Sequence, residues 1–179
     1  MLFRSDCVLK IGSNEQDELF FREYNMLREY NGRRFVKAYE GDIDKGKQKK
    51  AMLIERCIPG KRLTEVKSLE KRLAVFTALY NGLHIEPKNP EIYESYVKQV
   101  CDIEAEILSV YVQKAKDLFF EMIKTYDKEM LLHIDINSDN IVSDNGGYRI
   151  IDPKGIIGDP IFFYRAIYFC RMLPKYYTT

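Results

Sequence analysis

Cysteine is sparse in this sequence, and long apolar runs are missing. The four cysteines are far apart and form no CxxC pair, so neither a zinc site nor a disulfide framework is indicated. No apolar run is long enough to cross a bilayer, and segment 1–12 has too short an apolar stretch for a signal peptide. The net charge is +1, so there is no general attraction to nucleic acid or to an anionic membrane. These absences favour a cytoplasmic protein with reduced thiols and with neither nucleic acid nor membrane as a partner.

The 179 residues are 46% hydrophobic, which is enough for one or two small domains. The predicted order is a strand, a helix, two strands, a Pro59-Gly60 linker, mostly helices, and finally an acidic loop with a hairpin. This order predicts an α+β protein with a small sheet lobe, a larger helical lobe and a site between them. The expected elements are strands at 7–11, 35–40 and 51–57, a helix between Ser13 and Asn31-Gly32, helices within 63–83, 92–111 and 112–126, and strands near 131–132, 141–142 and 148–151.

Two charged side chains stand on otherwise apolar faces of these elements. Lys10 lies inside the first strand, where a lysine is poorly placed unless it is paired. Glu23 belongs to the apolar stripe of the first helix, whose other members are Leu19, Phe20, Met26, Leu27 and Tyr30. A carboxylate on that face requires a cation, and Lys10 is the nearest candidate upstream. The alternative is an edge-strand lysine that points to water.

The stretch 131–155, LLHIDINSDNIVSDNGGYRIIDPKG, carries three oxygen ligands on the ends of short apolar strands. Asp135 follows the first strand, Asn140 comes five residues later, and Asp152 ends the last strand. An Asn145-Gly146-Gly147 turn with the chemistry of a tight hairpin separates the last two strands.

The spacing of His133, Asp135, Asn140 and Asp152 follows the protein-kinase catalytic-loop pattern. Phosphoryl transfer needs an acid that orients the attacking hydroxyl, and hard oxygen ligands for Mg²⁺ on the phosphates. The alternative is a plain hairpin in which the Asp and Asn residues only form turns.

Three segments resemble the protein-kinase-like aminoglycoside phosphotransferases, and specifically the branch of the streptomycin and hydroxyurea resistance kinases. They are VLKI, FREYNML, and LLHIDINSDNIV followed by IIDPKGIIGDP; MLIERCIPGKRL also looks like the family's hinge. The resemblance implies a two-lobe kinase fold, with residues 1–59 as a partial N-lobe and residues 60–179 as a helical C-lobe.

The resemblance also implies a nucleotide site in the N-lobe. Lys10 would hold the α- and β-phosphates of ATP, and Glu23 would pair with Lys10. Glu55, Arg56 and Cys57 would form the hinge, whose backbone bonds adenine.

The remaining implied roles concern catalysis. Asp135 would be the catalytic acid/base, and Asn140 and Asp152 would bind Mg²⁺. The implied activity is ATP-dependent phosphorylation of a hydroxyl on an aminoglycoside-like alcohol such as streptomycin.

The sequence departs from the family pattern within the loop and at both ends. Ile134 stands where the family usually has Gly, and a β-branched residue there constrains the backbone. The family's first two strands and phosphate loop have no counterpart before the lysine strand, so that strand is expected to have a bare edge. The family pattern also stops at Phe163, so the chain is expected to be shortened at both ends.

Two other hypotheses for the function remain open from the sequence alone. A shortened chain could be a catalytically inactive remnant that keeps the fold and weak nucleotide binding. A third reading is an interaction module that uses the aromatic tail residues Phe162, Phe163, Tyr164, Tyr168 and Phe169.

Overall fold

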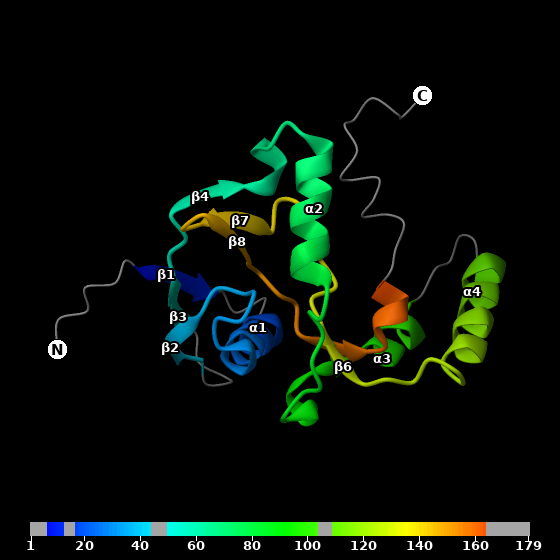
Figure 1. Cartoon of the computed structure of the whole chain (residues 1–179). Helices are drawn as coiled ribbons and strands as arrows, with labels where there is room; N and C mark the ends of the chain where they lie inside the picture. The colour runs from blue at the N-terminus through cyan, green and yellow to red at the C-terminus, as the bar shows by residue number, and fades with distance from the viewer. Residues whose placement is uncertain (1–6, 13–16, 44–49, 104–108, 164–179) are drawn as a thin grey trace.

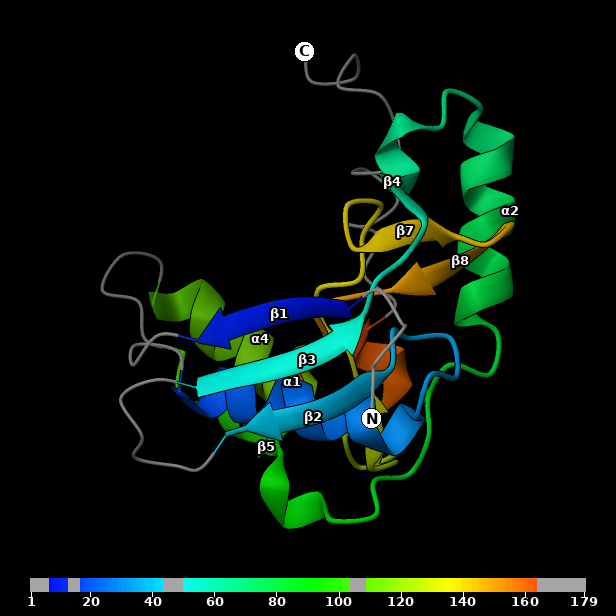
Figure 2. The same cartoon turned by 90° about the vertical axis from the view of Figure 1, so that its left-hand side faces the viewer.

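The computed structural model describes residues 7–12, 17–43, 50–103 and 109–163. Its first sheet has the antiparallel order β1-β3-β2, from β1 (Cys7–Gly12), β3 (Lys50–Glu55) and β2 (Ala38–Asp42). Helix α1 (Asp17–Tyr30) lies behind one face of this sheet (Figure 2). The proposed cap residues Ser13 and Gln16 lie outside the described residues.

The apolar stripe of α1 is turned toward the sheet and the core, as its 3.6-residue period predicts. Phe20, Met26, Leu27 and Tyr30 are buried, and Glu23 is buried with them. The helix ends at Asn31 and Gly32, whose φ values of 47° and 82° form the expected left-handed stop.

Strand β1 forms an edge of the first sheet in the described part of the chain, as expected. Leu9 and Ile11 alternate with Lys10 and are 58% and 67% exposed. Lys10 pairs in register with Met52 of β3, which is 1% exposed. Because directly opposed residues share a face, the Lys10 side chain projects to the α1 side of the sheet.

The Pro59-Gly60 segment was expected to be a linker, and this expectation is wrong. It belongs to strand β4 (Pro59–Arg62), which joins β7 (Ile141–Asp144) and β8 (Gly147–Ile150) in a second antiparallel sheet. Asp144 stabilises this pairing because its Oδ1 accepts a hydrogen bond from Ile58 N at 3.2 Å. A proline is tolerated there because it is the first residue of the strand.

The helical region is shorter and less regular than the apolar pattern predicted. It contains η2 (Leu63–Glu65), α2 (Leu69–Tyr80), η3 (Pro90–Ile92), α3 (Tyr96–Cys101) and α4 (Ser109–Met122). Ser68 caps α2 by accepting from Lys71 N, and the Arg34 guanidinium bonds the carbonyls of Ala78 and Leu79 at its other end.

Helix α4 does not bury the whole apolar stripe expected of it. It lies at the side of the molecule (Figure 1), and Phe119 is its buried residue. Leu118, expected on the packed stripe, is 63% exposed. Among the described residues, no helix is long and apolar enough to cross a membrane.

A third small sheet supports the loop that follows it. Its order is β5-β9-β6, from β5 (Glu94–Ser95), β9 (Ile156–Gly158) and β6 (Met130–Leu132), and η4 (Pro160–Phe163) comes next in the chain. Strands β5 and β9 were not expected from the sequence. Their pairing joins segments distant in the chain, and neither is long enough to show a strand period of its own.

One hydrophobic cluster runs through the molecule. It joins Leu27 and Phe35 with Leu131, Ile136 and Ile150. The loop after β6 and the end of β8 therefore rest on the same core that holds α1.

Candidate active site

The loop after β6 holds Asp135 in a strained backbone. Ile134, the residue before it, has φ 49°. A β-branched residue rarely adopts this left-handed conformation, and strain of this kind needs support from its surroundings. Here Leu132 and Ile136, on either side, are almost completely buried. The sequence departure at Ile134 thus falls where a glycine would fit the backbone with less strain.

His133 ties this loop to the segment that ends in Asp152. Its Nδ1 accepts from Asp135 N at 3.2 Å, so the ring proton is on Nε2, which donates to Ile151 O at 2.8 Å. The ring is 1% exposed, and burial lowers the pKa of His133 to about 4. A neutral histidine therefore fixes the loop that carries Asp135 against the residue before Asp152.

Two asparagines hold the backbone and carboxylate of Asp135. Asn140 Nδ2 donates to Asp135 O at 2.8 Å, and Asn137 Nδ2 donates to the same oxygen at 3.1 Å and to Oδ1 at 3.3 Å. The Asp135 side chain is 41% exposed, so its carboxylate is accessible from solvent. No role had been predicted for Asn137.

Lys10 stands between two carboxylates from distant parts of the chain. Its Nζ lies 2.7 Å and 2.8 Å from the two oxygens of Glu23 and 2.7 Å from Asp152 Oδ1. Burial acts to lower the pKa of Lys10, but Glu23 and Asp152 outweigh it and hold the pKa above its usual value. Burial raises the pKa of Glu23 against the opposing effect of Lys10. The Lys10–Glu23 pair expected from the sequence is present, and the water-facing alternative for Lys10 is wrong.

The expected hinge residues run along the chain from the end of β3 toward β4, and so connect the first sheet to the second. Glu55 ends β3 opposite Cys7 of the lysine strand, and Arg56 and Cys57 lead to β4. The Glu55 carboxylate accepts from Lys37 N at 3.0 Å. Among the described residues, no side-chain hydrogen bond or ion pair connects this segment directly with Lys10 or Asp135.

The donor set near Asp152 fits a small hard cation. The amide nitrogen of Asn140 is bonded to Asp135, so its carbonyl oxygen is the end left for a ligand. Ile151 N donates to Asn140 O at 3.0 Å, which places Asn140 beside the segment that carries Asp152. Within the described ranges, no cluster of three or more His, Cys, Asp or Glu residues could hold a metal ion. The side-chain oxygens of Asn140 and Asp152 are hard oxygen ligands of the kind that Mg²⁺ prefers, and two of them would leave most of its coordination positions to other oxygens.

Lys154 and Gly155, which follow Asp152 in the chain, also belong to the site, although no role had been predicted for either residue. Lys154 Nζ lies 4.0 Å from Asp135 Oδ2. Gly155, at φ +62°, packs against α1 so closely that a Cβ would lie 2.9 Å from the Arg22 Cβ and 3.0 Å from its carbonyl oxygen. The signal in the sequence was a lysine and a glycine two and three residues after Asp152.

Arg22 adds a second attachment of α1, this time to β5. Its Nη1 lies 2.6 Å from Glu94 Oε2, and both side chains are largely buried. The hydrogen bond from Arg22 is the main cause that lowers the pKa of Glu94. The helix that carries Glu23 is thus held at Gly155 and at Glu94.

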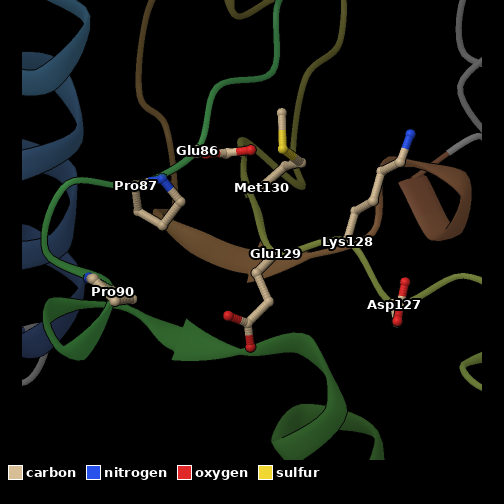
Figure 3. Close-up of a pocket in the computed structure, with 7 residues that line it drawn as sticks. All are labelled: Glu86, Pro87, Pro90, Asp127, Lys128, Glu129 and Met130. Atoms are coloured by element: carbon tan, nitrogen blue, oxygen red, sulfur yellow. The ribbon is translucent and has the colours of Figure 1, made fainter.

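The structure also contains a pocket of about 510 Å³ (Figure 3). Its lining is Glu86, Pro87, Pro90, Asp127, Lys128, Glu129 and Met130. Met130 begins β6, whereas Asp135 follows the other end of that strand. The pocket is therefore separate from the Lys10–Asp135 site.

Neither a protein-family model nor a curated protein matches the sequence. Solved structures do match. One is a thermostable mutant of the aminoglycoside phosphotransferase APH(4)-Ia in ternary complex with AMP-PNP and hygromycin B, with a TM-score of 0.61 and 15% identity over 90% of this chain and 64% of that chain. Another is the choline kinase LicA from Streptococcus pneumoniae, with a TM-score of 0.59 and 12% identity over 98% of this chain and 65% of that chain. The structure of LicA in complex with AMP matches with a TM-score of 0.53 and 16% identity over 97% of this chain and 63% of that chain.

These likenesses show that the chain shares its fold with small-molecule kinases. The fold combines helices with small, mainly antiparallel sheets, in agreement with the α+β expectation. The chain spans less than two thirds of the length of these matched structures.

Proposed function

We propose that this protein is an ATP- and Mg²⁺-dependent small-molecule O-phosphotransferase with a two-lobe kinase arrangement. The observation that carries the proposal is that Lys10 lies 2.7 Å from both Glu23 and Asp152. The segment that carries Asp152 is in turn joined to Asp135 by the two hydrogen bonds of the His133 ring. A plain hairpin would require none of these contacts.

In this proposal the residues form two groups, one that binds the nucleotide and one that binds the acceptor alcohol. On the nucleotide side, Lys10 is oriented by Glu23 and meets the phosphates, and the backbone of the hinge at Glu55, Arg56 and Cys57 meets adenine. On the acceptor side, the exposed carboxylate of Asp135 accepts the hydroxyl proton. Catalysis of this kind rests on positioning and on neutralisation of charge.

Asn140 and Asp152 would hold Mg²⁺, and the chemistry that the ion would supply there is neutralisation of phosphate charge. Asp152 Oδ1 is paired with Lys10. Nucleotide binding would therefore exchange this contact for contacts of Lys10 with phosphate oxygens.

For the acceptor we propose an aminoglycoside-like alcohol, such as streptomycin. Support comes from the IDPKG and GDP segments of the sequence and from the fold shared with a phosphotransferase solved with hygromycin B. The fold shared with a choline kinase makes choline a second alcohol for the acceptor panel. We place the protein in the cytoplasm, where ATP is available.

The first test compares the thermal midpoint with and without Mg²⁺-ATP in the parent, Asp135→Ala and Asp152→Ala proteins. A ligand that binds only the folded state adds about 2.7 kcal/mol of stability at a hundredfold excess over Kd. We expect the shift in the parent and in Asp135→Ala, and a much smaller shift in Asp152→Ala. Phosphate transfer to a panel of alcohols should be absent in Asp135→Ala.

An inactive remnant predicts a different result. The parent would then bind nucleotide weakly or not at all and would phosphorylate none of the panel. Equal loss of nucleotide binding in both variants would contradict the separate roles of Asp135 and Asp152.

A further inference from the structure

Lys154 has no role in the reaction as described so far, yet it is the cation closest to the catalytic acid. Its Nζ lies 4.0 Å from Asp135 Oδ2, and this is the one ion pair of Asp135 in the described part of the chain. That distance is too long for a direct hydrogen bond. Lys154 and Asp135 are 32% and 41% exposed in their side chains, so the pair contributes little to stability.

A backbone hydrogen bond fixes the position of the Lys154 main chain. Lys154 N donates to His133 O at 3.2 Å, the same carbonyl oxygen that accepts from Asp135 N at 2.8 Å. The following residue, Gly155, is held against Arg22 of α1. Lys154 is thus anchored between the catalytic loop and α1, while its ammonium group stays partly open to solvent.

The charge of Lys154 reaches both sides of the site. Burial raises the pKa of Glu23, on the Lys10 side, and the charge of Lys154 acts against this rise; burial lowers the pKa of His133, beside Asp135, and the charge of Lys154 adds to that effect. Lys10 is already engaged by Glu23 and Asp152. A phosphoryl group that moves from the Lys10 side toward Asp135 would therefore pass next to the second ammonium group.

We propose that Lys154 binds the phosphoryl group during its transfer and is a catalytic residue; this proposal rests on the phosphotransferase function proposed above. The acceptor oxygen forms a bond to the γ-phosphorus, and the bond from that phosphorus to the β,γ-bridging oxygen breaks. The bridging oxygen leaves with its electron pair on ADP, and the hydroxyl proton passes to Asp135. Lys154 keeps its own proton and neutralises charge on the non-bridging oxygens.

The test uses binding of Mg²⁺-AMP-PNP and Mg²⁺-ADP, measured by calorimetry, because only the first carries a γ-phosphoryl group. Lys154→Gln should weaken AMP-PNP binding by about 10- to 100-fold, as expected for loss of a charge-assisted hydrogen bond. ADP binding should change by less than about twofold, and Lys154→Arg should recover part of the AMP-PNP affinity. Lys98→Gln is the matched control, because Lys98 Nζ also lies 3.8 Å from a carboxylate, that of Glu94, and its side chain is 67% exposed.

Three results would overturn the proposal. If Lys154→Gln weakens both nucleotides equally, Lys154 has only a structural role. If the variant binds both as the parent does, Lys154 does not contact the γ-phosphoryl group, although the phosphotransferase function stands. If the parent binds neither nucleotide, the proposed function fails and Lys154 loses its role with it.

Discussion

Acidification should destabilise this protein, because the buried, neutral ring of His133 resists protonation in the folded state. The ring is neutral because Nδ1 accepts the Asp135 amide while Nε2 donates to Ile151 O. Its pKa is about 4 in the folded state and 6.5 in its usual state, because burial disfavours the charged ring. The pKa is lowered on folding, so the unfolded chain binds more protons between these two values, and stability is lost as the pH falls.

The magnitude follows from the linkage between proton binding and unfolding. At pH 7 both states of His133 are mostly neutral, whereas at pH 5 the unfolded ring is charged and the folded ring is still neutral. The free energy of unfolding should therefore fall by about 2 kcal/mol between pH 7 and pH 5 from this residue alone.

His133→Gln isolates this contribution. Urea unfolding at the two pH values can be followed by circular dichroism or by tyrosine fluorescence, since the chain has no tryptophan and 13 tyrosines. Glu23, whose pKa is raised by burial, opposes the loss of stability, and His84, whose pKa burial lowers to about 4, adds to it. Both remain in the variant, so they cancel in the comparison.

We expect the variant to be less stable than the parent at pH 7, because the buried His133 ring is removed together with its hydrogen bonds to Ile151 O and to the Asp135 amide, which keeps only the backbone carbonyl of residue 133 as an acceptor. It should also lose about 2 kcal/mol less than the parent on acidification to pH 5. Equal losses in parent and variant would refute the neutral, buried His133. His84→Gln should likewise reduce the pH dependence while leaving the Asp135 loop intact.

Two further predictions concern the attachments of α1. Gly155→Ala should destabilise the protein by several kcal/mol, because the added Cβ meets the Arg22 backbone as well as an unfavourable φ. Gly146→Ala is the matched control, with φ +85° and nothing within 4 Å, and should cost only about 1 to 2 kcal/mol; similar losses in urea unfolding would contradict the close contact. A double-mutant cycle of Arg22→Met and Glu94→Gln should give a coupling energy of about 1 to 2 kcal/mol at pH 7. This coupling should shrink as acid protonates Glu94, whose pKa is lowered by Arg22, and a coupling independent of pH would contradict the pairing.

Local sequence patterns were sufficient for the elements closest to the site. The apolar period of α1 singled out Glu23, and the same reasoning paired it with Lys10 across a loop. The Asn145-Gly146-Gly147 turn predicted the β7–β8 hairpin, and positive φ values at Asn145 and Gly146 match that turn. These predictions succeed because their causes act over a few residues.

Other elements depended on partners that the sequence does not identify. Strand β4 exists because Pro59–Arg62 finds β7, and the two-residue strand β5 exists because it pairs with β9. The apolar pattern of α4 predicted burial of Leu118, but the described residues leave that side chain mostly exposed. Pairing and burial of this kind involve contacts between distant segments, which a local period cannot report.

By itself the sequence determined which chemical groups are available: a strand lysine, a helix carboxylate, and Asp135, Asn140 and Asp152 at kinase-like spacing. Only the tertiary structure decided how they are used. Lys10 is shared between Glu23 and Asp152, and Lys154 is placed beside Asp135. Charges and pKa values depend on distance and burial, and both are set by the packing of segments far apart in the chain.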